Sequence, residues 1–157
     1  MPNEKSRGSD RTRNWTVVLY PESAPENWRD ILDALHIEWV ESPLHEFDTN
    51  ATGEVKKPHW HLLLMFGGVK SFEQVCEVVK PLNCPIPERC HNAKAMVRYM
   101  AHLDNPEKYR YSVSDIKAHG GVDISECCVR VRLSGIRLSL KSSILSMLKI
   151  SSNFRIC

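Results

Sequence analysis

The sequence lacks any apolar run approaching the roughly 20 residues that a membrane-spanning helix needs. Its first residues, MPNEKSRGSDRTRN, are polar and contain no apolar stretch of the kind found in secretory signal peptides. These absences predict a chain that stays in the cytoplasm and has no membrane partner. The chain also lacks CxxC pairs, so its six cysteines do not indicate a zinc site, and without an export signal we expect reduced thiols.

A strong excess of positive charge is also missing, since the chain of 157 residues has a formal net charge of +2. Residues 126–157 hold six Lys or Arg and one Glu, which leaves 15 basic and 18 acidic side chains, a net charge of −3, in residues 1–125. A generally basic DNA-binding body is therefore excluded. Any contact with nucleic acid has to come from local basic patches.

The length and the 42% content of hydrophobic residues suit a single domain with one core. We expect a flexible basic leader at residues 1–13, one folded domain at 14–125 and a basic tail at 126–157. The tail is rich in Ser, Leu, Ile and Arg but has no helix caps and no steady periodicity. We interpret it as a truncated or frameshifted end, the alternative being an amphipathic segment that binds DNA, a membrane surface or another subunit.

Three apolar runs predict strands, at residues 15–19, 37–40 and 59–66. Between the second and third runs, residues 48–57 form a polar segment containing Asn and Gly, which is typical of a turn. These two strands are therefore expected to pair as an antiparallel hairpin. The proline-rich segment 81–90 is either a loop or a fourth, edge strand.

Helix signals follow the first and third runs. Ser23 with Glu26 and Ser71 with Gln74 have the spacing of capping boxes, so helices are expected to begin at both places. A further helix is expected near the end of the folded domain. The resulting order, β-α-β-β-α and then a helix, describes an α+β fold in which helices pack on an antiparallel sheet.

His59 and His61 lie two residues apart at the head of the third run, so a strand projects both imidazoles from one face. The residues that alternate with them are expected to pack the opposite face into a core; they are Trp60, Leu62, Leu64 and Phe66. Two neutral imidazoles on a rigid strand are candidate ligands for a divalent metal. The alternative is a pair of polar residues at the edge of a core strand.

A second pair of candidate ligands, His45 and Asp48, follows the run 37–40 in the segment SPLHEFD. If the second and third strands pair, these residues converge on His59 and His61. Three imidazoles and one carboxylate suit manganese, magnesium or zinc and leave open positions for a phosphate oxygen. The alternative for the second pair is two ordinary polar groups in a loop.

Tyr99 falls on the inward face of a helix expected at about residues 93–103, for which Asn92 is a good N-cap. A tyrosine there is ordinarily a core residue. Beside a metal, its phenol becomes a candidate nucleophile for a phosphodiester. His102, three residues later, is either a local acid, base or phosphate contact or a partly buried helix residue.

Six basic residues form local patches that could hold DNA phosphates, although each is also compatible with ordinary solvated surface. Two precede the histidine pair, two share the Tyr99 helix, and two lie beside Tyr109 and Tyr111, whose rings could stack on unpaired bases. The six are Lys56, Lys57, Lys94, Arg98, Lys108 and Arg110.

The motifs SPLH-x-x-D, KPHWHLLL and AMVRYMAH, in this order, resemble those of the replication initiators (Rep proteins) of small rolling-circle bacterial plasmids, such as streptococcal ones. Those initiators are single-tyrosine members of the His-hydrophobic-His (HUH) endonuclease superfamily. The resemblance extends from about Asn14 to Ile124 and implies a ferredoxin-like or RNA-recognition-like fold.

This resemblance implies roles for five residues. His59 and His61 correspond to the metal-binding pair of the superfamily, and Tyr99 corresponds to its nucleophilic tyrosine. His45 and Asp48 correspond to accessory ligands of the plasmid group. The cofactor is then expected to be a divalent metal ion, manganese or magnesium.

The implied function is metal-dependent, site-specific nicking of a plasmid origin and strand transfer through a 5′-phosphotyrosine, a nicking-closing activity similar to that of a DNA topoisomerase. The expected partners are origin DNA, single-stranded or extruded as a hairpin, and the host replication machinery, with homo-oligomerisation left open. The alternatives are a non-catalytic DNA-binding regulator derived from such an initiator, a relaxase-like or transposase-like nuclease, and a metal-dependent hydrolase that uses water.

Overall fold

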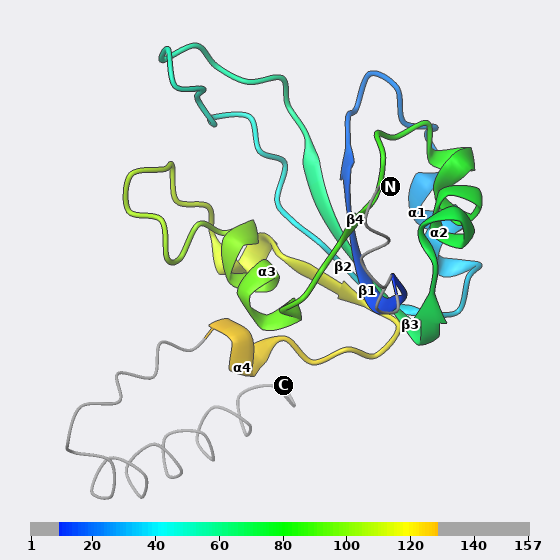
Figure 1. Ribbon diagram of the computed structural model, residues 1–157. Coiled ribbons are helices and arrows are strands. Elements are labelled where there is room, and N and C mark those ends of the chain that lie inside the picture. Colours follow the sequence, from blue (N-terminus) through cyan, green and yellow to red (C-terminus); the bar gives the residue numbers. More distant parts are fainter. Residues whose placement is uncertain (1–9, 129–157) are drawn as a thin grey trace, which may run out of the picture.

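The computed structural model describes residues 10–128, which form a five-stranded antiparallel sheet with helices on both faces (Figure 1). The strands are β1 (Thr12–Leu19), β2 (Glu38–Glu41), β3 (Trp60–Lys70), β4 (Glu88–Arg89) and β5 (Lys117–His119). The helices are α1 (Trp28–Asp33), α2 (Phe72–Val79), α3 (Ala93–Met100) and α4 (Ser125–Cys128), with short 3-10 turns η1 (Lys80–Leu82) and η2 (Val113–Asp115). The expected α+β class is confirmed.

The strands lie in the order β4-β1-β3-β2-β5, and every neighbouring pair is antiparallel. From β1 to β4 the chain runs β-α-β-β-α-β, which is the element order of ferredoxin-like folds. The predicted pairing of the second and third strands is confirmed by β2 and β3. Strand β4 pairs with β1 at the edge of the sheet, so the proline-rich segment 81–90 does contain an edge strand.

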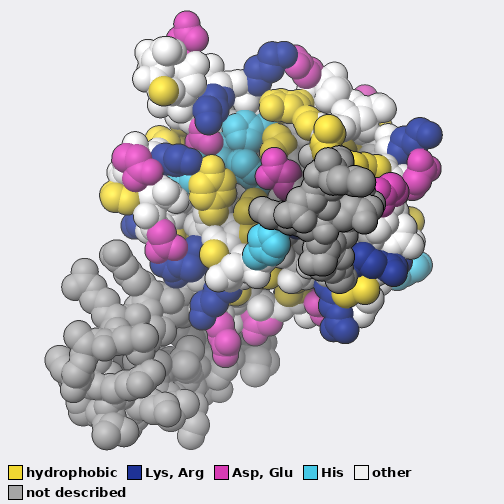
Figure 2. All heavy atoms as spheres, in the orientation of Figure 1, with side chains coloured by type: hydrophobic (Ala, Val, Ile, Leu, Met, Phe, Trp, Pro, Cys, Tyr) yellow, Lys and Arg dark blue, Asp and Glu magenta, His cyan; other side chains and the backbone are white. Residues whose placement is uncertain are grey.

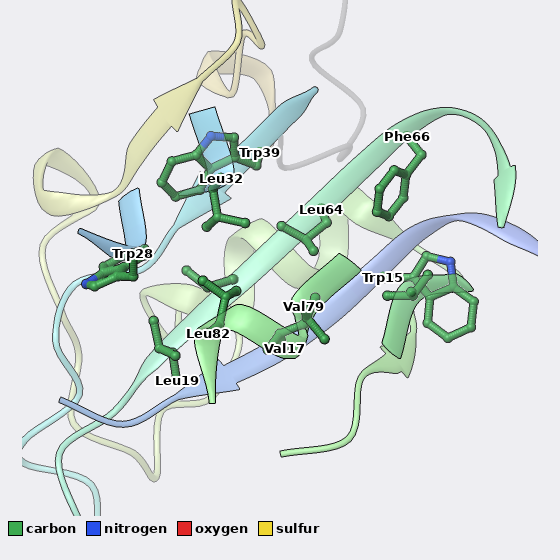
Figure 3. Packing of buried hydrophobic residues seen from close by; sticks show 12 residues of the cluster. Trp15, Val17, Leu19, Trp28, Leu32, Trp39, Leu64, Phe66, Val79 and Leu82 are labelled. Carbon is green, nitrogen blue, oxygen red and sulfur yellow. The ribbon is translucent and has the colours of Figure 1, made fainter. Parts of the chain in front are cut away.

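The two faces of the sheet carry separate hydrophobic clusters. Figure 1 shows α1 and α2 on one side of the sheet and α3 on the other. The larger cluster lies under α1 and α2, with Trp28 and Trp39 toward one end and Trp15 and Phe66 toward the other (Figure 3). A smaller cluster around Leu63, with Val97 and Met100 of α3, covers the opposite face.

Alternation along β3 decides which side chains reach which cluster. Leu62 and Leu64 are fully buried in the larger cluster, and Trp60 packs against it, as the sequence predicted. Leu63 joins the smaller cluster on the α3 face. His61, two residues before Leu63, therefore points toward α3.

Some element boundaries differ from those predicted. Helix α1 begins at Trp28 rather than near Ser23, because the Ser23 hydroxyl donates to the carbonyl of Tyr20 (3.4 Å) in a preceding turn. By contrast, the capping box of Ser71 and Gln74 at the start of α2 is confirmed.

Strand β1 begins at Thr12, inside the segment expected to be a leader, because Thr12 pairs with Lys70 of β3. Helix α3 ends at Met100 rather than near residue 103, and His102 follows in a left-handed conformation with φ 53°. The strand β5 was not predicted at all.

Within residues 10–128, no helix is both long and apolar enough to cross a lipid bilayer. The five cysteines of this part of the chain are free thiols; they are Cys76, Cys84, Cys90, Cys127 and Cys128. Cys157 lies outside the described residues, as does nearly all of the basic tail at 126–157.

Candidate active site

The candidate metal ligands come from the two ends of the long connection between β2 and β3. An isolated antiparallel bridge joins His45 to His59, with N–O distances of 2.8 and 3.2 Å. The Ser42 amide donates to the carbonyl of His61 (2.9 Å), and the Ser42 hydroxyl accepts from the His61 amide (2.9 Å). Backbone pairing therefore fixes the two histidine segments side by side.

The four residues expected to bind a metal form one cluster. One ligand atom from each of His45, Asp48, His59 and His61 can be chosen so that all four atoms lie within 4.8 Å of one another. Asp48 Oδ2 lies 3.0 Å from His45 Nδ1 and 3.7 Å from His59 Nε2. The donor set of three nitrogens and one carboxylate is one that manganese, zinc and related divalent ions accept.

Hydrogen bonds on the far side of two rings decide which nitrogen faces the cluster. His45 Nε2 donates to the carbonyl of Met100 (2.7 Å), and His59 Nδ1 donates to the carbonyl of Lys57 (2.7 Å), since a carbonyl can only accept. In the neutral rings, the lone pairs on the remaining nitrogens then point toward the Asp48 carboxylate. Lone pairs facing a carboxylate are unfavourable unless a cation lies between them, so this arrangement fits a divalent ion.

Burial favours the neutral, metal-binding form of His45 and His61 by lowering the pKa of each ring. Burial, together with the neighbouring His45 and His59, lowers the pKa of His61 to about 3. Burial also lowers the pKa of His45, more than its contacts with Met100 and Asp48 raise it. No proton has to be displaced from these two rings at neutral pH when a metal binds.

Asp48 is held as a carboxylate. Burial alone would raise its pKa, but the hydrogen bond from the Tyr111 hydroxyl and the nearby His45 bring the pKa below its usual value. Tyr111 Oη donates to Asp48 Oδ1 (2.8 Å) and accepts from the amide of Phe47 (3.0 Å). Its ring is buried and stacked on His45, with centroids 4.2 Å apart. Tyr111 was predicted to stack on DNA bases, but its buried ring lies against the candidate metal ligand His45.

His102 also lies behind Asp48. Its ring is fully buried, and Nδ1 donates to the carbonyl of Tyr109 (2.7 Å). Nε2 lies 3.9 Å from Asp48 Oδ2 and is the one buried side-chain nitrogen or oxygen of residues 10–128 without a hydrogen-bond partner. His102 Nε2 is thus a third imidazole nitrogen near the same carboxylate.

Tyr99 reaches this cluster from α3. Asn92 is the N-cap of this helix, as predicted, and its side chain accepts from the Ala95 amide (3.0 Å). The Tyr99 ring stands edge-on to His61 with centroids 5.4 Å apart, and its oxygen accepts a hydrogen bond from Lys108 Nζ (2.9 Å). The candidate nucleophile is therefore beside the candidate metal ligands.

The basic residues predicted to contact DNA differ in their exposure and in the ion pairs and hydrogen bonds that they already form. Lys57 is exposed and paired with Glu22 (2.7 Å). Arg98 is held by Asp104, with two N–O distances of 2.7 Å, and donates to the carbonyl of Cys127 (3.0 Å). Lys94 and Arg110 are exposed, and Arg110 also donates to the carbonyl of Leu103 (2.9 Å).

Two hollows lie near the cluster, in addition to one of about 230 Å³ that Asp48, Lys56 and Lys108 help to line. Lys56, Lys57 and Tyr20 line one of about 380 Å³ together with His59 and His61. A second, of about 620 Å³, is lined on one side by Phe47, Tyr109 and Arg110. Figure 2 shows histidine side chains at the surface of one face of the molecule, among hydrophobic, basic and acidic side chains.

Phe47 and Tyr109 form an exposed aromatic pair at the second hollow. Their rings are 53% and 51% exposed and have centroids 4.8 Å apart. Exposed rings beside a basic residue are a typical surface for unpaired bases. Sequence reasoning named Tyr109 for this purpose but missed Phe47, because the contact joins two loops that are far apart in the chain.

The fold and this cluster define a small α+β domain that brings four candidate metal ligands and a candidate nucleophilic tyrosine together. Residues 7–125 match the family described as "Plasmid replication protein, origin binding domain", and the chain belongs to that family. The predicted relation to plasmid replication proteins is therefore confirmed.

Individual relatives agree with this membership. The chain is 46% identical over 122 residues to a "Replication protein" of Staphylococcus aureus and 50% identical over 117 residues to "Replication protein RepB" of Lactiplantibacillus plantarum. These alignments cover 78% and 74% of this chain, but 61% and 53% of those relatives. A "Replication protein RepB" of Streptococcus agalactiae is 28% identical over 125 residues, which cover 60% of its length. The chain thus matches little more than half of each relative.

Proposed function

We propose that this chain is the origin-nicking part of a rolling-circle plasmid replication initiator, of the single-tyrosine HUH type. In this proposal it binds plasmid origin DNA, cuts one strand with the help of a divalent metal, and keeps one end of the cut strand covalently bound. The 3′-hydroxyl left behind is then available to the host replication machinery as a primer.

The observation that carries the proposal is the position of Tyr99 next to four metal-type ligands. His45, Asp48, His59 and His61 offer ligand atoms within 4.8 Å of one another, and the His61 ring contacts the Tyr99 ring. A structural tyrosine would need no such neighbours. A nucleophilic tyrosine needs them, because a phenol is a weak nucleophile and a phosphodiester is a poor electrophile.

Each group then has a defined task. A manganese or magnesium ion held by the four ligands supplies Lewis-acid polarisation of the scissile phosphate. Tyr99 Oη forms a bond to phosphorus while the bond to the 3′ oxygen breaks, which gives a 5′-phosphotyrosine and a free 3′-hydroxyl. Because the phosphodiester energy is retained in this link, a second transfer reseals the strand without ATP.

DNA contacts are assigned to residues around the cluster. Exposed phosphate contacts are proposed at four positions: Lys56, Lys57, Lys94 and Arg110. Two of the candidates exchange a present partner for a phosphate in this proposal: Lys57 leaves Glu22, and Arg98, which joins these contacts, leaves Asp104. The exposed rings of Phe47 and Tyr109 provide a stacking surface for unpaired bases of a single-stranded or extruded nick site.

The sequence predicted a nicking domain at residues 14–125; we propose that this domain takes in residues 12–128, because β1 begins at Thr12 and α4, which ends at Cys128, packs on α3. The expected location is the bacterial cytoplasm, where plasmid DNA is replicated. Assembly into a homo-oligomer is a further proposal; the matched region covers 53% of the Lactiplantibacillus plantarum relative, so that protein has sequence beyond it.

Supercoiled plasmid carrying the cognate origin tests the proposal. With manganese, the protein should convert closed circles to open circles with protein attached to the DNA, and a chelator should prevent the conversion. A regulator that only binds would shift the plasmid and leave it closed. A metal-dependent hydrolase would open it without any attached protein.

A further inference from the structure

Lys108 and Tyr99 are joined by a hydrogen bond between the lysine ammonium and the phenolic oxygen. Lys108 Nζ lies 2.9 Å from Tyr99 Oη and 4.6 Å from the centre of the tyrosine ring. We propose that Lys108 is a catalytic residue that stabilises negative charge on the Tyr99 oxygen during strand transfer. This inference rests on the proposed function, and it replaces the DNA-phosphate contact that the sequence suggested for Lys108.

Hydrogen bonds hold the loop after α3 in a conformation that places Lys108 beside Tyr99. The Tyr111 amide donates to the carbonyl of Ala101 (3.3 Å), and His102 Nδ1 donates to the carbonyl of Tyr109 (2.7 Å). These bonds tie the far end of the loop back to the end of the helix. Lys108 lies immediately before the tied segment, so its side chain is held over α3 and is only partly exposed.

Lys108 has the charge that this role needs. The hydrogen bond to Tyr99 is the main cause that raises the pKa of Lys108, so the side chain is an ammonium group at neutral pH. A charged donor strengthens its hydrogen bond as charge builds up on the acceptor. A preorganised donor aimed at developing charge acts on the transition state more than on the ground state.

The reaction balances without any further reactant. In cleavage, the bond from Tyr99 Oη to phosphorus forms and the bond from phosphorus to the 3′ oxygen breaks. The phenolic proton passes to solvent, and the 3′ oxygen takes a proton from solvent. In rejoining, a DNA 3′-hydroxyl attacks phosphorus and the Tyr99 oxygen leaves. Lys108 contacts the same oxygen in both directions, so its loss slows both steps.

Single-turnover cleavage of a single-stranded origin oligonucleotide by the full chain, with manganese and saturating DNA, tests this role. Lys108→Met should cleave about 100-fold more slowly than wild type, because loss of one such donor typically costs that much. Lys108→Arg, which keeps the charge, should be intermediate. The matched control Lys80→Met, in η1 and away from Tyr99, should cleave at the wild-type rate.

A second readout separates catalysis from DNA binding and from folding. In chelator, Lys108→Met should bind the oligonucleotide with unchanged affinity and salt dependence, and it should melt at the temperature of Lys80→Met. A phosphate contact would instead lower the slope of log affinity against log salt by about one unit, and the rate would recover at higher DNA concentration. That result, or wild-type cleavage by Lys108→Met, would overturn the inference. A wild type that forms no covalent adduct would overturn the proposed function, and this role with it.

Discussion

The Tyr111 hydroxyl donates a hydrogen bond to Asp48 Oδ1 over 2.8 Å, and this bond crosses 63 residues of sequence. It leaves Oδ2, the other carboxylate oxygen, directed at His45 and His59. The ring of Tyr111 also stacks on His45, so one side chain orients two candidate ligands. Residues that orient ligands in this way tune metal affinity without touching the metal.

Tyr111→Phe should therefore weaken metal binding while keeping the stacked ring. We expect manganese affinity to fall about tenfold, the lower end of the range for loss of a group that orients a ligand. Isothermal titration calorimetry with manganese measures this directly. Tyr109→Phe is the matched control, because Tyr109 is half exposed, and its affinity should equal that of the wild type. If wild type, Tyr111→Phe and Tyr109→Phe bind manganese with equal affinity, the Tyr111 hydroxyl does not contribute to metal binding.

Replacing His59 and His61 together with Ala should abolish manganese binding and DNA cleavage. The fold should persist, because neither side chain belongs to the two hydrophobic clusters. Calorimetry tests the binding, and far-UV circular dichroism tests the fold. His91→Ala, an exposed histidine away from the cluster, provides the control. Unchanged manganese binding by the folded double variant would rule out the proposed ligand set.

Acid should destabilise the metal-free protein through His61. Its pKa is about 3 in the folded chain, against a usual value of 6.5, so between these values the unfolded chain binds more protons. The stabilisation is fully present above about pH 6.5 and is lost as the pH falls toward 3, by at most about 1.4 kcal/mol per pH unit. Urea unfolding in chelator at several pH values measures the slope. His61→Asn should make it shallower, and an unchanged slope would show that His61 does not titrate in this way.

The sequence predicted the parts of the site that depend on local pattern. His59 and His61 follow from the two-residue period of a strand, and Asn92 follows from the preference of helix caps. The convergence of His45 on His59 follows from pairing β2 with β3, which a polar turn between two apolar runs already indicates. Each of these signals lies within a short stretch of chain.

The missed features depend on tertiary contacts rather than on a local sequence pattern. The three-residue strand β5 joins the sheet only because β2 is there to pair with it, and Gly120 next to it allows close approach to Ile37. Tyr111 and Lys108 acquire their partners through the fold of the loop after α3. No periodicity in the sequence distinguishes such a residue from an ordinary surface tyrosine or lysine.

Residues 129–157 are expected to be dispensable for cleavage of single-stranded DNA. The truncation should end at Cys128 rather than at Ser125, because Arg98 donates to the carbonyl of Cys127 and α4 packs on α3. A chain of residues 1–128 should then cleave an origin oligonucleotide at close to the rate of the full chain. If this chain folds and binds manganese but does not cleave, residues 129–157 contribute to the reaction.

Tyr99→Phe tests the central claim, covalent strand transfer, most directly. The change removes one oxygen and keeps the ring beside His61, so stability and manganese affinity should be nearly unchanged. Wild-type protein, incubated with manganese and a 3′-labelled origin oligonucleotide, should give a labelled protein band that survives boiling in detergent, and Tyr99→Phe should give none. A labelled band persisting in Tyr99→Phe, or cleavage by wild type without any labelled band, would contradict the account.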